Sequence, residues 1–457
     1  MRAGRRRGSG AWRRYAMSVD PRPLTALGRG LQREFGDRQR WLRRVLVLAF
    51  AGLAGVTVVG FVWATDQALA LFSQGRAAYP WLPLLWTPLC AAAIVWFTRR
   101  FVPGAAGSGI PQVMAALDTA MDAGQRSRLV SVRLAVAKFL LTVWGLLAGL
   151  SLGREGPSVQ VCAGVLYGAR RWLPKRYASS DHSLLVAGGA AGIAAAFNAP
   201  LAGVMFAIEE LSRHPEQRNS GLIIAAIVLA GLIAISVYGN ATYFGVIQVR
   251  DLHWSIVLPA LLVAVVSGLA GGIFARLLVK CLTNTGADPA SRLRRARPVT
   301  FAALCALVVA AIGIATDGAA FGSGYAHTKI MLSSGEHEPL VYALLKFCAT
   351  WFTAWSGVPG GIFAPSLAIG AALGNDVAVL TGYGHAPPLI ALGMAGFLAA
   401  ATQAPLTAFI IVMEMVDGHS LVLSLMATAL VASAISKALS PPLYASLAAA
   451  QPGVSAR

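Results

Sequence analysis

The sequence places a carboxylate where a charge is unfavourable. Glu155 stands in the motif Gly153-Arg154-Glu155-Gly156-Pro157, and the flanking segments 140–152 and 159–167 are mostly apolar. An ionisable residue within a membrane-spanning stretch is a candidate functional group. The two glycines let the backbone bend, and Pro157 suits the first turn of a helix. The motif therefore predicts a helix N-terminus with Glu155 at its tip, where free N–H groups and the helix dipole favour an anion.

A second glycine motif, Gly107-Ser108-Gly109-Ile110-Pro111, leads into a predicted helix at 111–121. Its backbone N–H groups and the Ser108 hydroxyl could contact an anion without any full positive charge. Both motifs also have simpler interpretations. Glu155 would then be an N-cap residue at a membrane interface, and the second motif would be an ordinary loop. The two motifs alone leave these alternatives open.

The composition is that of a membrane protein. Of 457 residues, 56% are hydrophobic and 12% are charged, about half the charged fraction of soluble domains. Several apolar runs approach the ~20 residues that span a bilayer, and shorter ones interrupted by Gly or Pro indicate broken helices. The sequence therefore predicts an all-α polytopic membrane protein. The runs are 45–64, 82–97, 134–152, 221–237, 254–274, 301–315, 390–401 and 421–434.

The formal net charge of +19 does not indicate nucleic-acid binding, because the basic residues gather in particular loops. Thirteen arginines precede residue 45, whereas the predicted loops 66–80 and 238–253 carry one arginine each. This asymmetry follows the positive-inside rule and predicts a cytoplasmic N-terminus. We therefore expect a basic segment, 1–44, followed by a transmembrane domain, 45–457.

Cysteine and histidine residues do not form a recognisable site. The five cysteines lack paired spacing, and the seven histidines are scattered. The cysteines are typical of small core residues, and a lone histidine is more often structural than a ligand. The sequence thus predicts no metal, no cofactor and no enzyme. An integral-membrane enzyme acting on an anionic lipid would need a nucleophile or metal cluster of a kind that does not appear.

The chain repeats itself. Residues 190–201 resemble 395–406, with Pro200 matching Pro405 at an offset of 205, and Glu209 correspondingly matches Glu414. Gly153-Arg154-Glu155-Gly156-Pro157 resembles Gly361-Ile362-Phe363-Ala364-Pro365 at an offset of 208. These blocks indicate two structural halves, approximately 45–238 and 254–440. Transporters commonly bind their substrate where such repeats meet.

One further acidic residue is Glu210, which follows a predicted helix at 199–208 and precedes the basic loop 213–218. On this spacing it lies near the cytoplasmic end of a helix. The simpler interpretation, which the sequence alone favours, is a surface glutamate paired with Arg213.

Together these elements resemble the CLC family of chloride channels and chloride/proton antiporters. The resemblance rests on the Ser108, Glu155 and Phe363 motifs and on Tyr444, in that order, and it covers the chain from about residue 45. It implies an inverted-repeat helical fold and a homodimer with one anion pathway in each subunit. It also implies a multi-pass protein of a bacterial-type inner membrane that contacts lipid and lacks cytoplasmic nucleotide-binding domains.

The resemblance assigns roles to particular residues. Ser108 and Tyr444 would contribute hydroxyl groups to a central chloride, and the backbone N–H groups of Ile362 and Phe363 would bind the same ion. Glu155 would be the gating glutamate, and Glu210 matches the internal proton-transfer glutamate of many antiporters. The remaining residues of these motifs also match the family pattern. They are Gly107, Gly109, Pro111, Gly153, Arg154, Gly156, Pro157, Gly361 and Pro365.

The resemblance favours a chloride/proton antiporter gated by Glu155, with chloride and protons as its partners. The alternative is a passive voltage- or pH-gated chloride channel on the same fold, and Glu210 is the residue that separates the two. Gln112 stands where many relatives carry an acidic residue.

Overall fold

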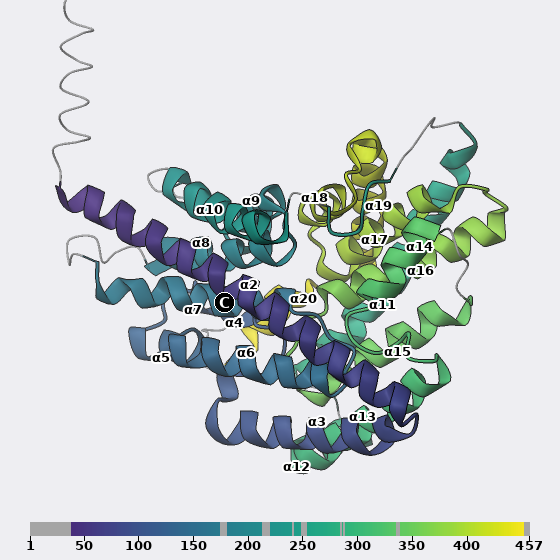
Figure 1. Cartoon of the computed structure of the whole chain (residues 1–457), viewed down its shortest axis with the longest axis horizontal. Coiled ribbons are helices and arrows are strands. Elements are labelled where there is room, and N and C mark those ends of the chain that lie inside the picture. Colours follow the sequence, from purple (N-terminus) through teal and green to yellow (C-terminus); the bar gives the residue numbers. More distant parts are fainter. Residues whose placement is uncertain are drawn as a thin grey trace, which may run out of the picture. The chain divides into compact units, whose positions relative to one another are not determined.

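The computed structural model describes residues 38–173, 181–212, 220–239, 242–247, 254–283, 286, 288–334 and 339–451. Within these ranges, helices and their connections make up the chain, with one isolated antiparallel bridge between Gly153 and Gly361 (Figure 1). The contacts divide the chain into Met1–Val45 and Leu46–Arg457. The predicted basic segment 1–44 lies almost wholly outside the described residues.

The helices of the first half run from α2 to α10. Their bounds are α2 Arg38–Ala78, α3 Leu82–Phe101, α4 Ile110–Ala116, α5 Ala123–Leu129, α6 Val132–Leu147, α7 Glu155–Gly168, α8 Asp181–Ala196, α9 Pro200–Phe206 and α10 Ser220–Tyr238. Two short helices, η2 Ala169–Arg171 and η4 Ala207–Leu211, follow α7 and α9.

The helices of the second half run from α11 to α20. Their bounds are α11 Val257–Leu282, α12 Pro289–Ala296, α13 Pro298–Ala315, α14 Tyr325–Ser334, α15 Val341–Ser356, α16 Phe363–Thr381, α17 Ala386–Thr402, α18 Pro405–Val416, α19 Val422–Leu439 and α20 Leu443–Ala449.

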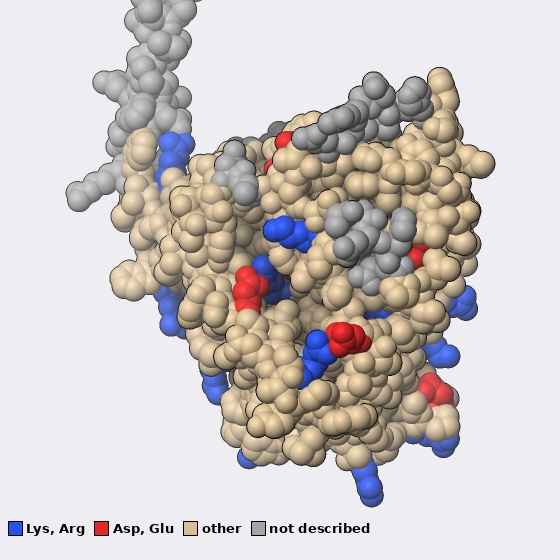
Figure 2. Space-filling model, turned by 45° about the vertical axis from the view of Figure 1, so that its right-hand side comes forward, with Lys and Arg blue, Asp and Glu red and all other residues tan. Residues whose placement is uncertain are grey.

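Eight helices in the described residues are long and apolar enough to cross a membrane, which confirms the prediction of a polytopic helical protein. Others, such as α4, α9 and α20, have seven residues each and are too short to span a bilayer. They are the broken helices that the interrupted apolar runs predicted. Most side chains on the face shown in Figure 2 are neither acidic nor basic, and a few charged side chains meet in its hollowed centre.

The two halves pack in the same way. In the first, α7 lies against α8, which contacts α9 and α10; in the second, α16 lies against α17, which contacts α18 and α19. Glycines allow the close approach. A Cβ on Gly188 of α8 would lie 2.7 Å from the Ala163 Cα of α7. At the equivalent seam, Gly370 of α16 and Gly393 of α17 contact each other's backbone.

Two predicted boundaries are wrong. The loop predicted at 66–80 is mostly helical, since α2 continues to Ala78. Asp66 does not end the helix, because it pairs with Arg154, and the residues after it include good helix formers.

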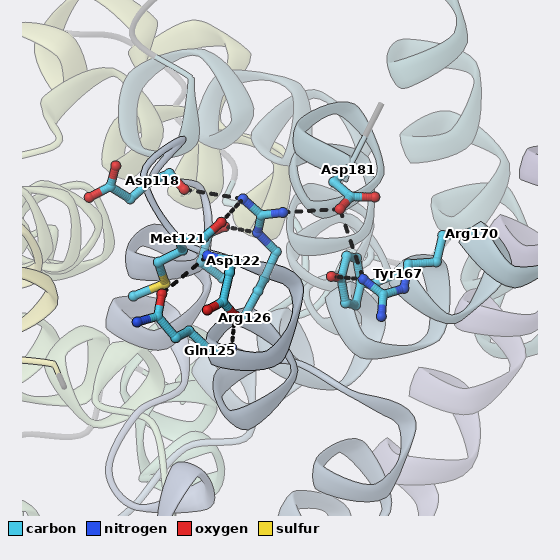
Figure 3. A network of polar contacts seen from close by, with 9 residues as sticks. Asp118, Met121, Asp122, Gln125, Arg126, Tyr167, Arg170 and Asp181 are labelled. Atoms are coloured by element: carbon cyan, nitrogen blue, oxygen red, sulfur yellow. Dashed lines mark hydrogen bonds and ion pairs between the residues drawn. The ribbon is translucent and has the colours of Figure 1, made fainter. Parts of the chain in front are cut away.

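The helix predicted at 111–121 ends at Ala116. Arg126 of α5 donates hydrogen bonds to the carbonyls of Ala116, Asp118 and Met121 at 2.8, 3.1 and 3.3 Å (Figure 3). These bonds satisfy the carbonyls at the helix end, so the chain can turn there.

Candidate functional site

Two helix N-termini meet at Gly153 and Gly361, the two glycines that occupy matching positions in the repeat. Gly153 and Gly361 exchange backbone hydrogen bonds of 2.8 Å in both directions, directly before α7 and α16. A Cβ on Gly361 would lie 3.0 Å from the Gly156 nitrogen. Glycine is therefore required for the first turns of α7 and α16 to come this close.

Glu155 lies at this junction. Its side chain is buried, with 1% exposed, and its Oε2 accepts a hydrogen bond from the Ala364 N–H at 3.4 Å. The carboxylate of Glu155, which belongs to the first half of the chain, thus lies at the N-terminus of α16. Helix α16 is the equivalent of α7 in the second half. Free N–H groups and the helix dipole make that position an anion site.

Arg154, next to the glutamate, ties α7 to α2. Its guanidinium donates to the Thr65 hydroxyl at 3.0 Å and to the Tyr243 hydroxyl at 2.9 Å, and it forms an ion pair with Asp66. A hollow of about 560 Å³ opens beside it, lined also by Tyr325 and Lys329. We call this the Arg154 hollow.

A second hollow, of about 180 Å³, lies against the other predicted residues. Ser108, Ile362 and Tyr444 all line it, together with Gly107 and Pro111. We call this the Ser108 hollow. The structure therefore brings three of the four predicted chloride-binding residues to one cavity.

The two hydroxyl groups at the Ser108 hollow are buried and interact with each other, and neither makes a well-formed hydrogen bond to any other group among the described residues. Buried hydroxyls in proteins almost always have one, so this pair of atoms is available to a ligand. Ser108 Oγ also packs against Gly156, where an added Cβ would clash with it. The hydroxyl therefore lies beside the first turn of α7.

Phe363 contributes a ring as well as a backbone N–H. The side chain is buried, and its ring centroid lies 6.0 Å from that of Tyr444, 6.3 Å from Phe197 and 6.4 Å from Phe206. This aromatic cluster packs around the N-terminus of α16.

Glu210 lies in the π-helical turn η4 and is half-buried. It is close enough to Tyr444 to act electrostatically on the phenol, as Glu155 is. The alternative partner Arg213 lies outside the described residues. The neighbouring Glu209 accepts hydrogen bonds from the N–H groups of Leu406 and Thr407, at 3.1 and 2.7 Å.

A buried cation that was not predicted from the sequence lies behind the Ser108 loop. Lys138 of α6 has no exposed surface, and its ammonium donates to the carbonyls of Ala105, at 2.9 Å, and Gly107. A lysine within the apolar run 134–152 was a visible signal, because such a charge needs buried partners.

The matching residue in the second half is Lys346, at the same offset of 208 as the glycine pair. It is also fully buried and donates to the carbonyls of Ala320 and Gly322, each at 2.9 Å. The loop that it holds, Gly322-Ser323-Gly324, repeats Gly107-Ser108-Gly109. This third repeated block was also overlooked.

The described residues contain no group of three or more His, Cys, Asp or Glu side chains that could hold a metal ion. The five cysteines are free thiols, four of them buried.

Comparison with known proteins identifies the family to which this architecture belongs. A family model described as voltage gated chloride channel matches residues 90–437. The chain belongs to the CLC family. Two relatives of this CLC chain are named H(+)/Cl(-) exchange transporter ClcA. The relative from Cronobacter sakazakii is 31% identical, over 95% of this chain and 92% of the relative. The relative from Salmonella typhimurium is 30% identical, over 88% of this chain and 87% of the relative.

Solved structures share the CLC fold. A slow cyanobacterial Cl−/H+ antiporter superposes with a TM-score of 0.76 and 26% identity, covering 88% of this chain and 96% of that one. A CLC-type fluoride/proton antiporter superposes with a TM-score of 0.70 and 23% identity, covering 87% and 95%. The second likeness concerns the fold alone. The predicted inverted-repeat CLC fold is confirmed.

Proposed function

We propose that this CLC protein exchanges chloride for protons across a membrane. The observation that carries the proposal is the position of the Glu155 carboxylate on the N-terminus of α16. There it lies between Arg154, which lines one hollow, and Ile362, which lines the other. A carboxylate that occupies an anion site between two cavities acts as a gate. The exchange activity named for the two ClcA relatives supports the same conclusion.

The central chloride would bind at the Ser108 hollow. The hydroxyls of Ser108 and Tyr444 are buried and make no well-formed hydrogen bond to any other group among the described residues. The N–H groups of Ile362, the cap residue, and of Phe363 lie at the start of α16. Such a site offers partial charges rather than a salt bridge. Binding of this kind is weak enough for the ion to leave, which transport requires.

Coupling would follow from competition for the N-terminus of α16. The ionised Glu155 and a chloride ion exclude each other there, because both are anions and the position holds one. Protonation removes the charge of the carboxylate and frees the position for chloride. Linkage requires the converse, so chloride binding promotes proton uptake by Glu155.

Glu210 would pass protons between Glu155 and the solution on the cytoplasmic side. Its electrostatic interaction with Tyr444 supports this role, since the same phenol also interacts with Glu155. The proton route would thus approach the chloride route at Tyr444, but protons would be carried by the Glu210 carboxylate, which is not part of the chloride site.

The assembly and location that we propose are those of bacterial-type family members. The N-terminal segment 1–44 would lie in the cytoplasm, and the domain 45–457 would form a homodimer in the inner membrane. Exposed apolar side chains on α9 and α19 support a surface for a second copy or for lipid; Leu201 is 57% exposed and Leu423 is 75% exposed.

The test is a liposome assay that records chloride and proton fluxes together. A chloride gradient should drive protons uphill in the opposite direction. Chloride flux without proton movement, under the same gradient, would favour the passive channel instead.

A further inference from the structure

A third hollow, of about 580 Å³, lies away from the proposed chloride route. Arg133, Arg170 and Arg171 line it together with Ser127, Val132 and Trp172. We call it the Arg133 hollow. The arginines come from two places in the chain, the start of α6 and the short helix η2 that follows α7. Among the described residues that line the hollow, none is acidic.

Only one of the three arginines is neutralised by a described carboxylate. Arg170 lies 3.9 Å from Asp181 and stacks over the Tyr167 ring at 4.1 Å. Asp181 is already shared, because Arg126 binds the same oxygen at 3.0 Å (Figure 3). Arg133 and Arg171 are exposed and make no ion pair or side-chain hydrogen bond with the described residues. The hollow therefore carries an excess of positive charge.

Backbone and hydroxyl groups add to this attraction for anions. Helix α6 begins at the hollow, and its cap residue Ser131 also lines it. The positive end of a 16-residue helix dipole thus points toward the same place as the arginines. Arginine guanidinium groups match phosphate oxygens in pairs, which makes phosphate the anion that this chemistry fits best.

The surroundings identify the source of the phosphate. Val132, in the hollow wall, is 52% exposed, and the exposed apolar stripe continues along α6 with Val136 at 55% and Leu140 at 59%. Because these residues are four apart, they share one face of the helix. Trp172, at the rim, is 70% exposed, as expected for an aromatic residue at a membrane interface. A charged hollow that opens onto an apolar, outward-facing helix stripe fits a headgroup and its acyl chain together.

We propose that the Arg133 hollow binds the phosphate of an anionic phospholipid, with the acyl chain along Val132, Val136 and Leu140. Arg133 and Arg171 contact the phosphate, Arg170 completes the wall, and Trp172 covers the headgroup from the rim. The site does not depend on which ion the protein transports. It does connect to the gate, because α7, which begins at Glu155, ends at Gly168 in the wall of this hollow.

The experiment measures lipid binding to the purified, full-length protein in neutral detergent. Phosphatidylglycerol and phosphatidylcholine are titrated separately, and bound lipid is counted by native mass spectrometry. The wild-type protein should prefer phosphatidylglycerol. Arg133→Gln with Arg171→Gln should weaken that binding about 30-fold, since each surface arginine contributes about fivefold to the affinity for an anionic lipid.

The matched control is Arg99→Gln with Arg100→Gln, two exposed arginines in the last turn of α3, outside the hollow. It removes the same charge and should leave the preference unchanged. Equal loss in the control variant would mean a general charge effect and would overturn the proposal.

A second pair of measurements distinguishes a lipid from a soluble anion. Val136→Asn interrupts the apolar stripe without touching the arginines, and it should weaken phosphatidylglycerol binding. Inorganic phosphate, added at the concentration of the lipid, should not displace it. If phosphate displaces the lipid fully and Val136→Asn has no effect, the hollow is a site for a soluble anion and the lipid assignment is wrong.

Discussion

The two halves of the chain build the same loop and use it differently. In each, a fully buried lysine donates to the carbonyls of a Gly-Ser-Gly loop: Lys138 to that around Ser108 and Lys346 to that around Ser323. The four loop glycines adopt positive φ, 69° and 104° at Gly107 and Gly109, 62° and 84° at Gly322 and Gly324. The conformation of the loop and the buried lysine that holds it are therefore present in both halves, although the two loops do not share one function.

The difference lies in what each loop carries. Ser108 lines the Ser108 hollow, and its buried hydroxyl makes no well-formed hydrogen bond within the described residues. The Ser323 hydroxyl instead accepts a hydrogen bond from the Tyr325 N–H at 3.4 Å. Likewise, α7 begins with Glu155, whereas α16 begins with Phe363. The repeat thus supplies two equivalent helix N-termini, those of α7 and α16. They differ because only α7 begins with a carboxylate, that of Glu155. We expect the scaffold to respond symmetrically to substitution and the transport chemistry to respond asymmetrically.

The largest structural effect should come from the lysines. Lys138→Met and Lys346→Met each leave at least two buried carbonyls without a donor, at ~1–3 kcal/mol per group. Both should lower the free energy of unfolding by roughly 2–6 kcal/mol, and the thermal midpoint in detergent should fall in both. Lys437→Met, an exposed lysine at the end of α19, is the control and should change little. A large loss in one variant and none in the other would contradict the equivalence of the halves.

The next effect distinguishes the two serines. Ser108→Ala removes a hydroxyl from the proposed chloride site and should weaken chloride binding about ten- to a hundredfold, since a hydrogen bond to an ion contributes ~1.5–3 kcal/mol. Ser323→Ala should leave chloride affinity unchanged. Isothermal titration calorimetry of both variants measures this. Equal weakening in the two variants would show that the second loop also faces the ion.

The smallest effect concerns reciprocal contacts between the halves. Glu209 caps the N-terminus of α18, and Glu414 caps that of α9 through the N–H groups of Leu201 and Ala202, at 3.2 and 2.7 Å. Glu209→Gln and Glu414→Gln keep the shape of each side chain but remove its charge. Each should cost ~0.5–1 kcal/mol of stability, visible as similar small shifts of the thermal midpoint. The symmetry of the caps would be refuted if one variant were neutral and the other unfolded the protein.

Much of this arrangement was predictable from the sequence because it rests on local chemistry. Gly153 and Pro157 bracket a helix start, and the repeat offset predicted that Gly361 would match Gly153. The repeat did not predict that these two glycines hydrogen-bond each other, because that contact joins segments far apart in the chain. Glu155 could be recognised because a carboxylate is rare in an apolar stretch.

What the sequence did not predict depends on contacts between distant segments. Asp66 looked like the end of a helix, because its partner Arg154 lies far along the chain. The end of α4 at Ala116 depends on Arg126, which lies beyond the helix that was predicted there. Lys138 and Lys346 were visible as charges in apolar runs, but the carbonyls that they bind became clear only once the loops were placed.

The central claim is that Glu155 couples chloride movement to proton movement and that Glu210 supplies the protons. The most direct measurement is the dual-flux liposome assay on Glu155→Ala and Glu210→Gln beside the wild-type protein. Glu155→Ala should pass chloride without pH dependence and without moving protons. Glu210→Gln should also stop proton transport while sparing much of the chloride flux. If Glu210→Gln still drives protons uphill on a chloride gradient, the proton route assigned to Glu210 is wrong; if Glu155→Ala does so, the gate itself is misplaced.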